Sequence, residues 1–282
     1  MKRILVPTDF SNNAYSALFY ATCLFGEEAC QFYILHTYEV NTPVLTSRID
    51  TDKGNRLYKK LKGSSEEKLA ETLHAIVRDT EELKHSFETI SISKNLLDSI
   101  RKTIRKKEID VVVMGTKGAT GAAAFFMGSN TVQVIQEIHE CPILLIPDQY
   151  VYRKPSEIGF STDLKRFYLE KEIKPLVDFA TNLDTAIRIF HINEKEKLDE
   201  IQEYNYTILS RYLKGLKHTI HWISKMDSKT KLIQDFIGHY DIDLLVMINY
   251  KHSFIEMITH EPIIKKIGFQ AAIPFLVIPD AS

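Results

Sequence analysis

Three glycines and a serine follow a short apolar segment at a spacing that suits phosphate binding. The segment Asp110-Val-Val-Val-Met114 leads into Gly115 and Gly118, and Gly128-Ser129 closes the pattern G-x2-G-x9-G-S. Glycine has no Cβ, so it can adopt positive φ and leave its N–H groups open to an anion. The pattern is not a P-loop, because no Gly-Lys-Ser/Thr closes it, and its last glycine lies too far along for the dinucleotide fingerprint. The alternative is a loop that needs glycine only for its turns.

Alternating strand and helix patterns would position this loop. A first helix is expected after Asp9 or Ser11, and either residue could cap it. Further helices are expected over 64–79, near 96–104 and over about 129–138. The polar segment 41–63 is expected to be a long, irregular and only partly helical connection. Such alternation predicts an α/β fold with a parallel sheet and helices on both faces. Strands are expected at 3–8, 32–37, 87–93, 110–115 and 142–147.

The second half of the chain repeats the first. Thr162-Asp163 matches Thr8-Asp9, and the run Asp243-Leu-Leu-Val-Met247 matches the strand before the glycines. Pro274-Phe-Leu-Val-Ile-Pro279 likewise matches Pro142-Ile-Leu-Leu-Ile-Pro147. We therefore expect two domains, 1–149 and 156–282, joined by a polar boundary segment.

Composition narrows the function classes. The chain has 282 residues and a net charge of −1, so no global field favours nucleic acid or an anionic membrane as a partner. The three cysteines Cys23, Cys30 and Cys141 lack metal-binding spacing and fit a reducing compartment. There is no run of about 18 apolar residues, and Asp9 interrupts the first apolar run, so neither a spanning helix nor a signal peptide is expected. A cytoplasmic protein is the expectation.

Several segments resemble the universal stress protein family. These are Ile4-Leu-Val-Pro-Thr-Asp9-Phe-Ser11, Leu35-His36-Thr37, the glycine pattern and the run 142–147. The resemblance covers the first half and, more weakly, the second, so the chain looks like a tandem member. It implies two tandem open sheets of five parallel strands, a Rossmann-like fold of the adenine-nucleotide α-hydrolase type. It also implies ATP as the cofactor, with AMP or ADP as alternatives and Mg²⁺ accompanying the nucleotide.

The family's nucleotide site can be carried over by position. Asp9 and its neighbours would contact the nucleoside, Thr37 would offer main-chain hydrogen bonds to adenine, and the glycine loop would hold the phosphates. Since a carboxylate repels phosphate, Asp9 is expected to accept a ribose hydroxyl or bind Mg²⁺ through water; the alternative is a helix N-cap. The implied binding residues are Pro7, Thr8, Asp9, Thr37, Met114, Gly115, Gly118, Gly128, Ser129 and Asn130. No catalytic residue and no protein metal site is assigned.

The second copy departs from the pattern. In the register that aligns Asp110 with Asp243, the glycines and serine become Ile248, Lys251, Glu261 and Pro262. Glu261 would repel phosphate and Pro262 has no N–H to offer. We therefore expect a degenerate second domain, in which Asp163 is a helix cap rather than a ligand.

Three other features have plainer interpretations. His36 and His191 are expected to be packed, hydrogen-bonded residues rather than catalysts. The basic cluster within 101–107 is expected to be a solvated helix end. His252, Glu256 and His260 only loosely resemble a metal-binding helix face.

The leading hypothesis is a stress-response regulator that binds adenine nucleotide in its first half. The alternatives are a slow metal-dependent ATP hydrolase and an interaction scaffold with a vestigial site. The matched strands 142–147 and 274–279 are expected to pair within one chain as a pseudo-dimer, with homodimerisation left open.

Overall fold

The computed structural model describes residues 1–39, 48–117, 127–193, 197–224, 226–227, 229–250 and 273–280. It divides into two compact units. The first comprises Met1–Cys141 and Ile146–Tyr152, and the second comprises Pro142–Leu145 and Arg153–Ser282. Both units alternate strands and helices, which confirms the expected α/β class. No helix within the described part has the length and apolar character needed to cross a bilayer.

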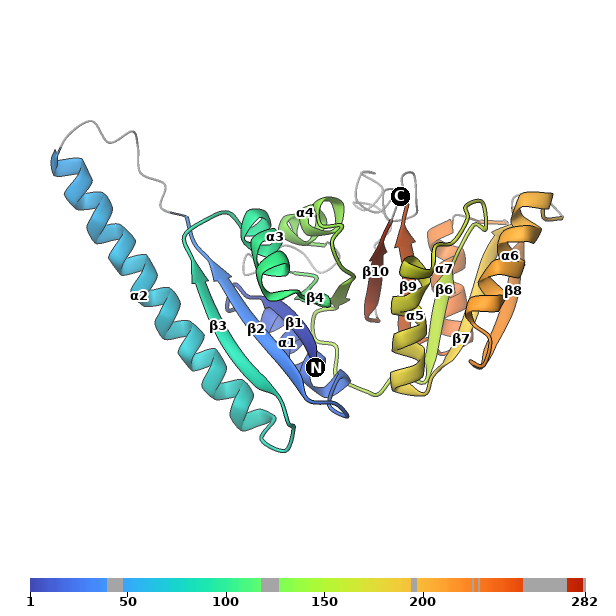
Figure 1. The fold of residues 1–282 in the computed structure, drawn as a ribbon, viewed down its shortest axis with the longest axis horizontal. Coiled ribbons are helices and arrows are strands. Elements are labelled where there is room, and N and C mark those ends of the chain that lie inside the picture. Colours follow the sequence, from blue (N-terminus) through green and yellow to red (C-terminus); the bar gives the residue numbers. More distant parts are fainter. Residues whose placement is uncertain are drawn as a thin grey trace. The chain divides into compact units, whose positions relative to one another are not determined.

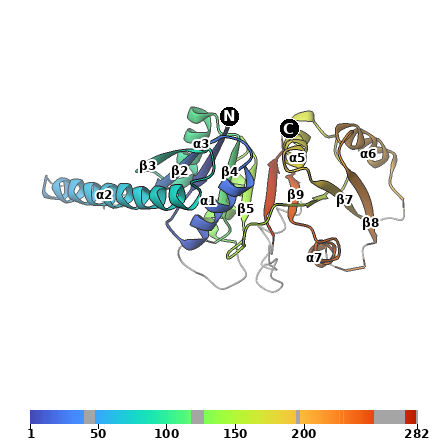
Figure 2. The ribbon, with the colours of Figure 1, turned by 90° about the horizontal axis from the view of Figure 1, so that it is seen from below.

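The first unit is a parallel sheet in the order β3-β2-β1-β4, covered on both faces. Helices α1 and α2 lie on one face, and α3 and α4 lie on the other (Figures 1 and 2). The strands are β1 (Lys2–Pro7), β2 (Cys30–Thr37), β3 (Ser86–Ile92) and β4 (Val111–Gly115). The helices are α1 (Asn12–Leu24), α2 (Arg48–Asp79), α3 (Leu96–Lys107) and α4 (Ser129–Glu137).

The second unit contains a sheet in the order β5-β10-β9-β6-β7-β8. The order β8-β7-β6-β9 repeats that of β3-β2-β1-β4, and α5 and α6 lie on one face opposite α7 (Figure 2). The strands are β5 (Ile143–Ile146), β6 (Glu157–Ser161), β7 (Ala186–Asn193), β8 (His218–Ser224), β9 (Leu244–Asn249) and β10 (Phe275–Pro279). The helices are α5 (Glu170–Leu183), α6 (Glu200–Tyr212) and α7 (Lys229–His239).

Strand β5 differs from the other strands in its pairing. Its residues Ile143–Leu145 run antiparallel to Phe275–Val277 of β10, all within the second unit. The expected pairing between the last strands of the two halves is therefore present at this register. Within the described residues the two units hold four and six strands rather than five and five, because Ile143–Leu145 of β5 pair with β10 in the second unit.

The central strands explain the apolar runs of the sequence. Ile4, Leu5 and Val6 of β1 are completely buried, and all five residues of β4 are buried. A strand that is covered on both faces needs apolar side chains at every position, so it reads as a continuous run instead of an alternation. The loops at the strand ends are thereby attached to the most rigid part of each sheet.

Helix α2 corrects the expectation for 48–63. This stretch is helical, and only 41–47 lies outside the described residues. Its lysines, arginines and leucines are good helix formers, and it continues a helix that Leu69 and Ile76 bury against the sheet. A glycine within a helix costs only about 1 kcal/mol, so Gly63 does not end it. Figure 1 shows the first half of α2 extending beyond the strands.

The basic cluster of α3 is a helix end with ion pairs. Its cations lie in the last turns, where they complement the helix dipole. The pairs are Arg101–Glu137 at 3.1 Å, Arg105–Glu140 at 3.4 Å and Lys107–Glu88 at 2.7 Å. These contacts support the interpretation as a solvated helix end.

Candidate nucleotide site

The carboxyl ends of three neighbouring strands bring most of the expected site residues to one edge of the first sheet. Strand β1 is parallel to both β2 and β4, so all three end at the same edge. This edge carries Pro7 at the end of β1, Thr8 and Asp9 just after it, Thr37 at the end of β2, and Met114 and Gly115 at the end of β4. Gly118 lies outside the described residues. Ligand crevices of open α/β sheets lie at such an edge.

The turn after β1 is held by its own side chains. Thr8 N–H donates to Leu35 O at 2.8 Å, and Thr8 Oγ1 accepts from Phe10 N–H at 3.0 Å. Asp9 Oδ1 accepts from Ser11 N–H at 3.0 Å, and Ser11 Oγ accepts from Ala14 N–H at 3.2 Å. Of the two caps left open by the sequence, Ser11 is therefore the helix N-cap. Asp9 is an exposed carboxylate on the turn.

Thr37 presents its main chain where β1 has ended. Leu35 faces β1, since its carbonyl accepts from Thr8, whereas Tyr38 N–H donates to Ile92 O of β3 at 3.1 Å. Because alternate residues of a strand direct their N–H and C=O groups to opposite sides, Thr37 faces the β1 side. The last β1 residue in register with β2 is Pro7, opposite Leu35. The main-chain N–H and C=O of Thr37 thus lie beyond the last paired residue of β1 and β2, where a planar base could form hydrogen bonds with them.

His36 is a packed histidine, as expected. Its ring lies 4.3 Å from that of Phe10, and its Nδ1 is 2.8 Å from Ser65 Oγ, which in turn is 2.7 Å from Ser91 Oγ. Burial lowers the pKa of His36, and the nearby Lys68 cation lowers it further. The ring is thus a neutral support for the turn at Phe10, whose φ is 64°.

Two hydrogen bonds join the ends of the glycine pattern. Gly128 N–H donates to Thr116 O at 2.7 Å, and Thr131 Oγ1 donates to Gly115 O at 3.1 Å. They fix the start of α4 against the end of β4. The N–H of Gly128 is therefore satisfied by the protein, which corrects the expectation that it is open to phosphate.

The N-terminus of α4 lacks a side-chain cap. Its N-cap is Gly128, with φ −60° and ψ 148°, and no side chain accepts from the first turn. The first N–H groups of a helix have no partner within it, and the helix dipole favours an anion there. Ser129 and Asn130, at the start of this helix, are exposed. The available donors therefore begin at Ser129, one residue later than expected.

A neighbouring side chain accounts for Gly115. A Cβ on this residue would lie 2.3 Å from Oδ1 of Asn13. Asn13 is only 4% exposed; its Oδ1 accepts from Lys117 N–H at 2.8 Å and its Nδ2 donates to Ile146 O at 3.4 Å. Gly215 is the only described glycine with positive φ, so neither Gly115 nor Gly128 uses the positive φ that glycine permits.

Sequence reasoning missed Asn13 and the ion pair beside it. Lys117 Nζ lies 2.9 Å from Asp148 Oδ2, with both side chains largely buried. The signal for Asn13 was an amide on the apolar side of a helix, a position that demands hydrogen-bond partners. Together these residues position the end of β4.

The second unit keeps the turn but not the glycines. Thr162 Oγ1 accepts from Leu164 N–H at 3.1 Å, Asp163 Oδ1 accepts from Lys165 N–H at 2.9 Å, and Leu164 has φ 57°. Helix α5 begins later, with Leu169 as its N-cap, so the expectation that Asp163 caps a helix is wrong. Of the substituted glycine positions, Ile248 is buried in β9, while 251–272 lie outside the described residues.

Metal ligands do not gather in the part of the chain that is described. No three His, Cys, Asp or Glu side chains there are placed to hold a metal ion. His252, Glu256 and His260 fall outside it.

Known proteins similar to this chain point to one family. The model of the universal stress protein family matches residues 1–147, just over half of the chain. The chain belongs to this family. A universal stress protein from Methanocaldococcus jannaschii is 28% identical over 154 residues, which cover 51% of this chain and 81% of that protein. A second one from the same organism is 25% identical over 153 residues, covering 51% and 94%. These matches support a stress-related role.

Solved structures resemble the whole chain. The crystal structure of a universal stress protein from Archaeoglobus fulgidus matches 98% of this chain and 96% of its own, with a TM-score of 0.66 at 16% identity. The cytoplasmic domain of a prokaryotic cation chloride cotransporter matches 98% of this chain and 94% of its own, with a TM-score of 0.54 at 10% identity. At these identities the likeness shows the fold alone.

Proposed function

We propose that this universal stress protein binds ATP, or a related adenine nucleotide, in its first unit and acts as a regulator. The uncapped start of α4 carries the proposal. It is a helix N-terminus fixed at the carboxyl edge of a parallel sheet, with Ser129 and Asn130 leading its exposed first turn. Membership of the family supports the choice of an adenine nucleotide.

The remaining residues suit the other parts of the nucleotide. The outward main chain of Thr37 would pair with adenine, and Asp9 would accept a ribose hydroxyl or hold Mg²⁺ through water. Met114 and Gly115 would form the floor of the site. When bound, the nucleotide would supply the negative charge that the start of α4 lacks, and Ser129 would add its hydroxyl as a donor.

The proposal is tested first by what the purified chain carries. Mass spectrometry of small molecules released from fresh protein should detect adenine nucleotide, and calorimetry should give one ATP per chain. A chain that neither carries nor binds nucleotide would favour the scaffold alternative. Two equivalent sites per chain would contradict the expectation that the second domain is degenerate.

A substitution at the start of α4 tests the location. Gly128→Glu places a negative charge beside the phosphates, so ATP affinity should fall at least tenfold, about 1.4 kcal/mol. The residue has φ −60°, so its backbone accepts a side chain. Gly238→Glu makes the same change in α7, where a Cβ meets nothing within 4 Å, and should leave affinity unchanged. Glu261→Gln should also have no effect. Full binding by Gly128→Glu would contradict the location.

Turnover separates a regulator from a slow hydrolase. We expect no steady ATP hydrolysis with Mg²⁺ or Mn²⁺, since no residue is assigned as a base for attack on the γ-phosphate. A steady rate that Asp9→Asn abolishes would favour the hydrolase.

A further inference from the structure

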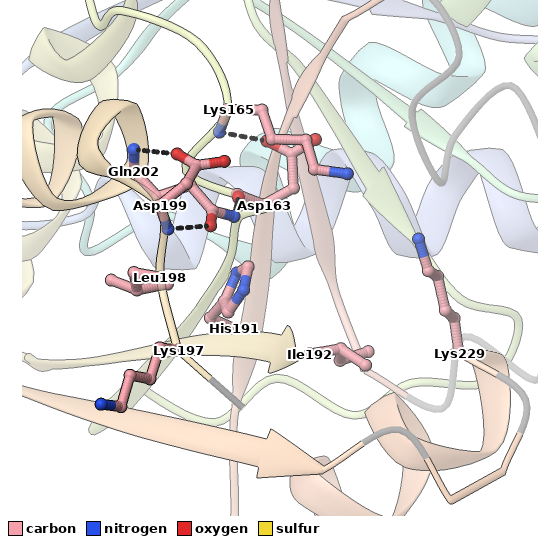
Figure 3. Close-up of a pocket in the computed structure, with 9 residues that line it drawn as sticks. All are labelled: Asp163, Lys165, His191, Ile192, Lys197, Leu198, Asp199, Gln202 and Lys229. Carbon is pink, nitrogen blue, oxygen red and sulfur yellow. Dashed lines mark hydrogen bonds between the residues drawn. The ribbon is translucent and has the colours of Figure 1, made fainter. Parts of the chain in front are cut away.

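The second unit contains a small polar pocket where β6 and β7 end. Its volume is about 100 Å³, and Figure 3 shows the side chains around it. The lining includes Asp163 and Lys165 after β6, His191 in β7, and Lys229 at the start of α7. The pocket therefore lies at the same edge of its sheet as the nucleotide site proposed in the first unit, but its walls differ.

His191 supplies the pocket with a buried nitrogen. The residue is only 4% exposed, and its Nδ1 lies 3.0 Å from Thr162 O. A carbonyl oxygen can only accept, so Nδ1 must carry the proton, and Nε2 of the neutral ring is then an acceptor. Because the ring lines the cavity, Nε2 is the atom that it offers to an occupant.

The rest of the described lining carries more positive than negative groups. It contains lysines 165, 197 and 229 and aspartates 163 and 199, an excess of one positive charge with the histidine neutral. Asp199 Oδ1 accepts from Gln202 N–H at 2.9 Å, and Gln202 Nε2 donates to Asp163 O at 2.9 Å. Both carboxylates thus accept main-chain N–H groups of their own turns. In Figure 3 the ammonium groups of Lys165 and Lys229 lie on the other side of the pocket from that of Lys197.

We propose that this pocket binds a small oxyanion of the phosphate class. A phosphate O–H would donate to Nε2 of His191, and its charged oxygens would accept from Lys165 and Lys229. Hydrogen phosphate suits both demands, because near neutrality it has a proton to give and oxygens that accept. A carboxylate or sulfate has no such proton. The ligand that fits is therefore inorganic hydrogen phosphate, because the dianion of a phosphate monoester has no such proton.

Size and sequence separate this site from the proposed nucleotide site. Sites for drug-sized ligands occupy roughly 300–1,000 Å³, so a cavity of about 100 Å³ holds one small group and not a nucleotide. The first unit has Ser11 in the place of Lys165 and Thr37 in the place of Ile192. The lysine lining therefore belongs to the second unit, and the proposal does not depend on nucleotide binding.

Calorimetry with inorganic phosphate tests the site in the full chain. Every protein carries Gly128→Glu, so that the proposed nucleotide site adds no phosphate binding. Lys165→Gln/Lys229→Gln should weaken phosphate binding at least tenfold, about 1.4 kcal/mol. The matched pair Lys214→Gln/Lys217→Gln removes the same charge from exposed positions before β8, at the opposite edge of the sheet, and should change affinity less than about twofold. Equal losses in both pairs, or none in the first, would overturn the proposal.

Nitrogen NMR of ¹⁵N-histidine protein gives a readout that does not depend on surface charge. Phosphate in mildly alkaline buffer should shift the Nε2 resonance of His191, assigned with His191→Gln, while sulfate should not. Glycerol phosphate, whose dianion has no phosphate proton, should bind more weakly than inorganic phosphate if the free ion is the ligand. Tighter binding of glycerol phosphate would overturn the hydrogen bond assigned between a phosphate proton and Nε2. No shift of Nε2 with either phosphate would overturn the role given to His191.

Discussion

At the residue scale, one glycine of the motif is explained by packing and another by a helix start. Gly115 makes room for the amide of Asn13, which holds the end of β4 through Lys117 and Ile146. Gly128 begins α4 without placing a side chain over its first turn. A single sequence pattern thus serves both a structural and a proposed binding role.

Substitution of Gly115 should therefore affect the stability of the fold more directly than it affects nucleotide binding. Gly115→Ala places a Cβ 2.3 Å from Asn13 Oδ1, so we expect the free energy of unfolding to fall. Overpacking of this kind typically lowers it by about 1–3 kcal/mol, which urea denaturation would measure. Gly63→Ala, in open space on α2, should instead stabilise by up to about 1 kcal/mol. In the double variant Asn13→Ala/Gly115→Ala the two losses should not add up, because substitutions of contacting residues are not additive. Full additivity would show that the clash is not the cause.

The three thiols should differ in reactivity. Burial raises the pKa of Cys30 to about 11 and that of Cys141 to about 12, while Cys23 is half-buried with a smaller rise. Only Cys23 should react with a thiol reagent in mildly alkaline buffer until the chain unfolds, because the thiolate is the nucleophile.

The sign of the accompanying pH dependence follows from linkage. The folded chain holds these thiol protons more tightly than the unfolded chain, whose thiols titrate near about 8.5. The contribution of these thiols to the free energy of unfolding is therefore fully present below that pH. It is lost as the pH rises toward 11 for Cys30 and 12 for Cys141. Fast labelling of Cys141 in folded protein would contradict its burial.

At the element scale, the two halves of helix α2 differ in burial. Its second half is buried against the sheet through Leu69 and Ile76, whereas Leu57 and Tyr58 of its first half are about two-fifths exposed. Few buried contacts mean that the first half opens at low free-energy cost.

Limited trypsin digestion should therefore cut α2 first in its exposed half. The sites there include Arg56, Lys59, Lys60 and Lys62. Since 41–63 follows β2, whose end carries Thr37, we expect ATP to slow cleavage in this stretch. Identical digestion with and without ATP would contradict a position beside the nucleotide.

The turn after β6 depends on helix α6. Asn205 is 2% exposed, and its Nδ2 donates to Leu164 O at 2.8 Å, where the backbone has positive φ. Asn205→Ala leaves a buried carbonyl unpaired, so unfolding free energy should fall by about 1–3 kcal/mol. Thr207→Ala, on the exposed face of the same helix, should change it by less than about 0.5 kcal/mol. Equal effects would show that α6 itself, and not the turn, was weakened.

At the scale of the whole molecule, two units share a strand order and differ in their ligand edges. Both place a Thr-Asp turn after their first strand, with the same side-chain hydrogen bonds. In the first unit the groups proposed to bind the ligand are main-chain N–H groups of α4, and in the second they are lysine ammonium groups together with the acceptor Nε2 of His191. We propose that the chain arose as a tandem repeat whose second copy changed its ligand.

The single tryptophan distinguishes the two units in a thermal experiment. Trp222 lies in β8 of the second unit. A ligand at a hundred times its Kd stabilises its binding unit by about 2.7 kcal/mol. ATP should therefore raise the melting temperature of the calorimetric transition that belongs to the first unit. The melting temperature followed by Trp222 fluorescence should stay unchanged. An ATP-induced shift of the Trp222 transition alone would place the nucleotide in the second unit.

The order of strands and helices in the first half, the two candidate caps of the first helix and the family could be predicted from the sequence, because these signals are local. Buried strands must be apolar throughout, and side chains in a tight turn bond their own backbone. Only the tertiary structure decided the rest. The reason for Gly115 and the pocket around His191 depend on residues far apart in the chain. No local pattern encodes such contacts, since their energy exists only once the sheet has brought the partners together.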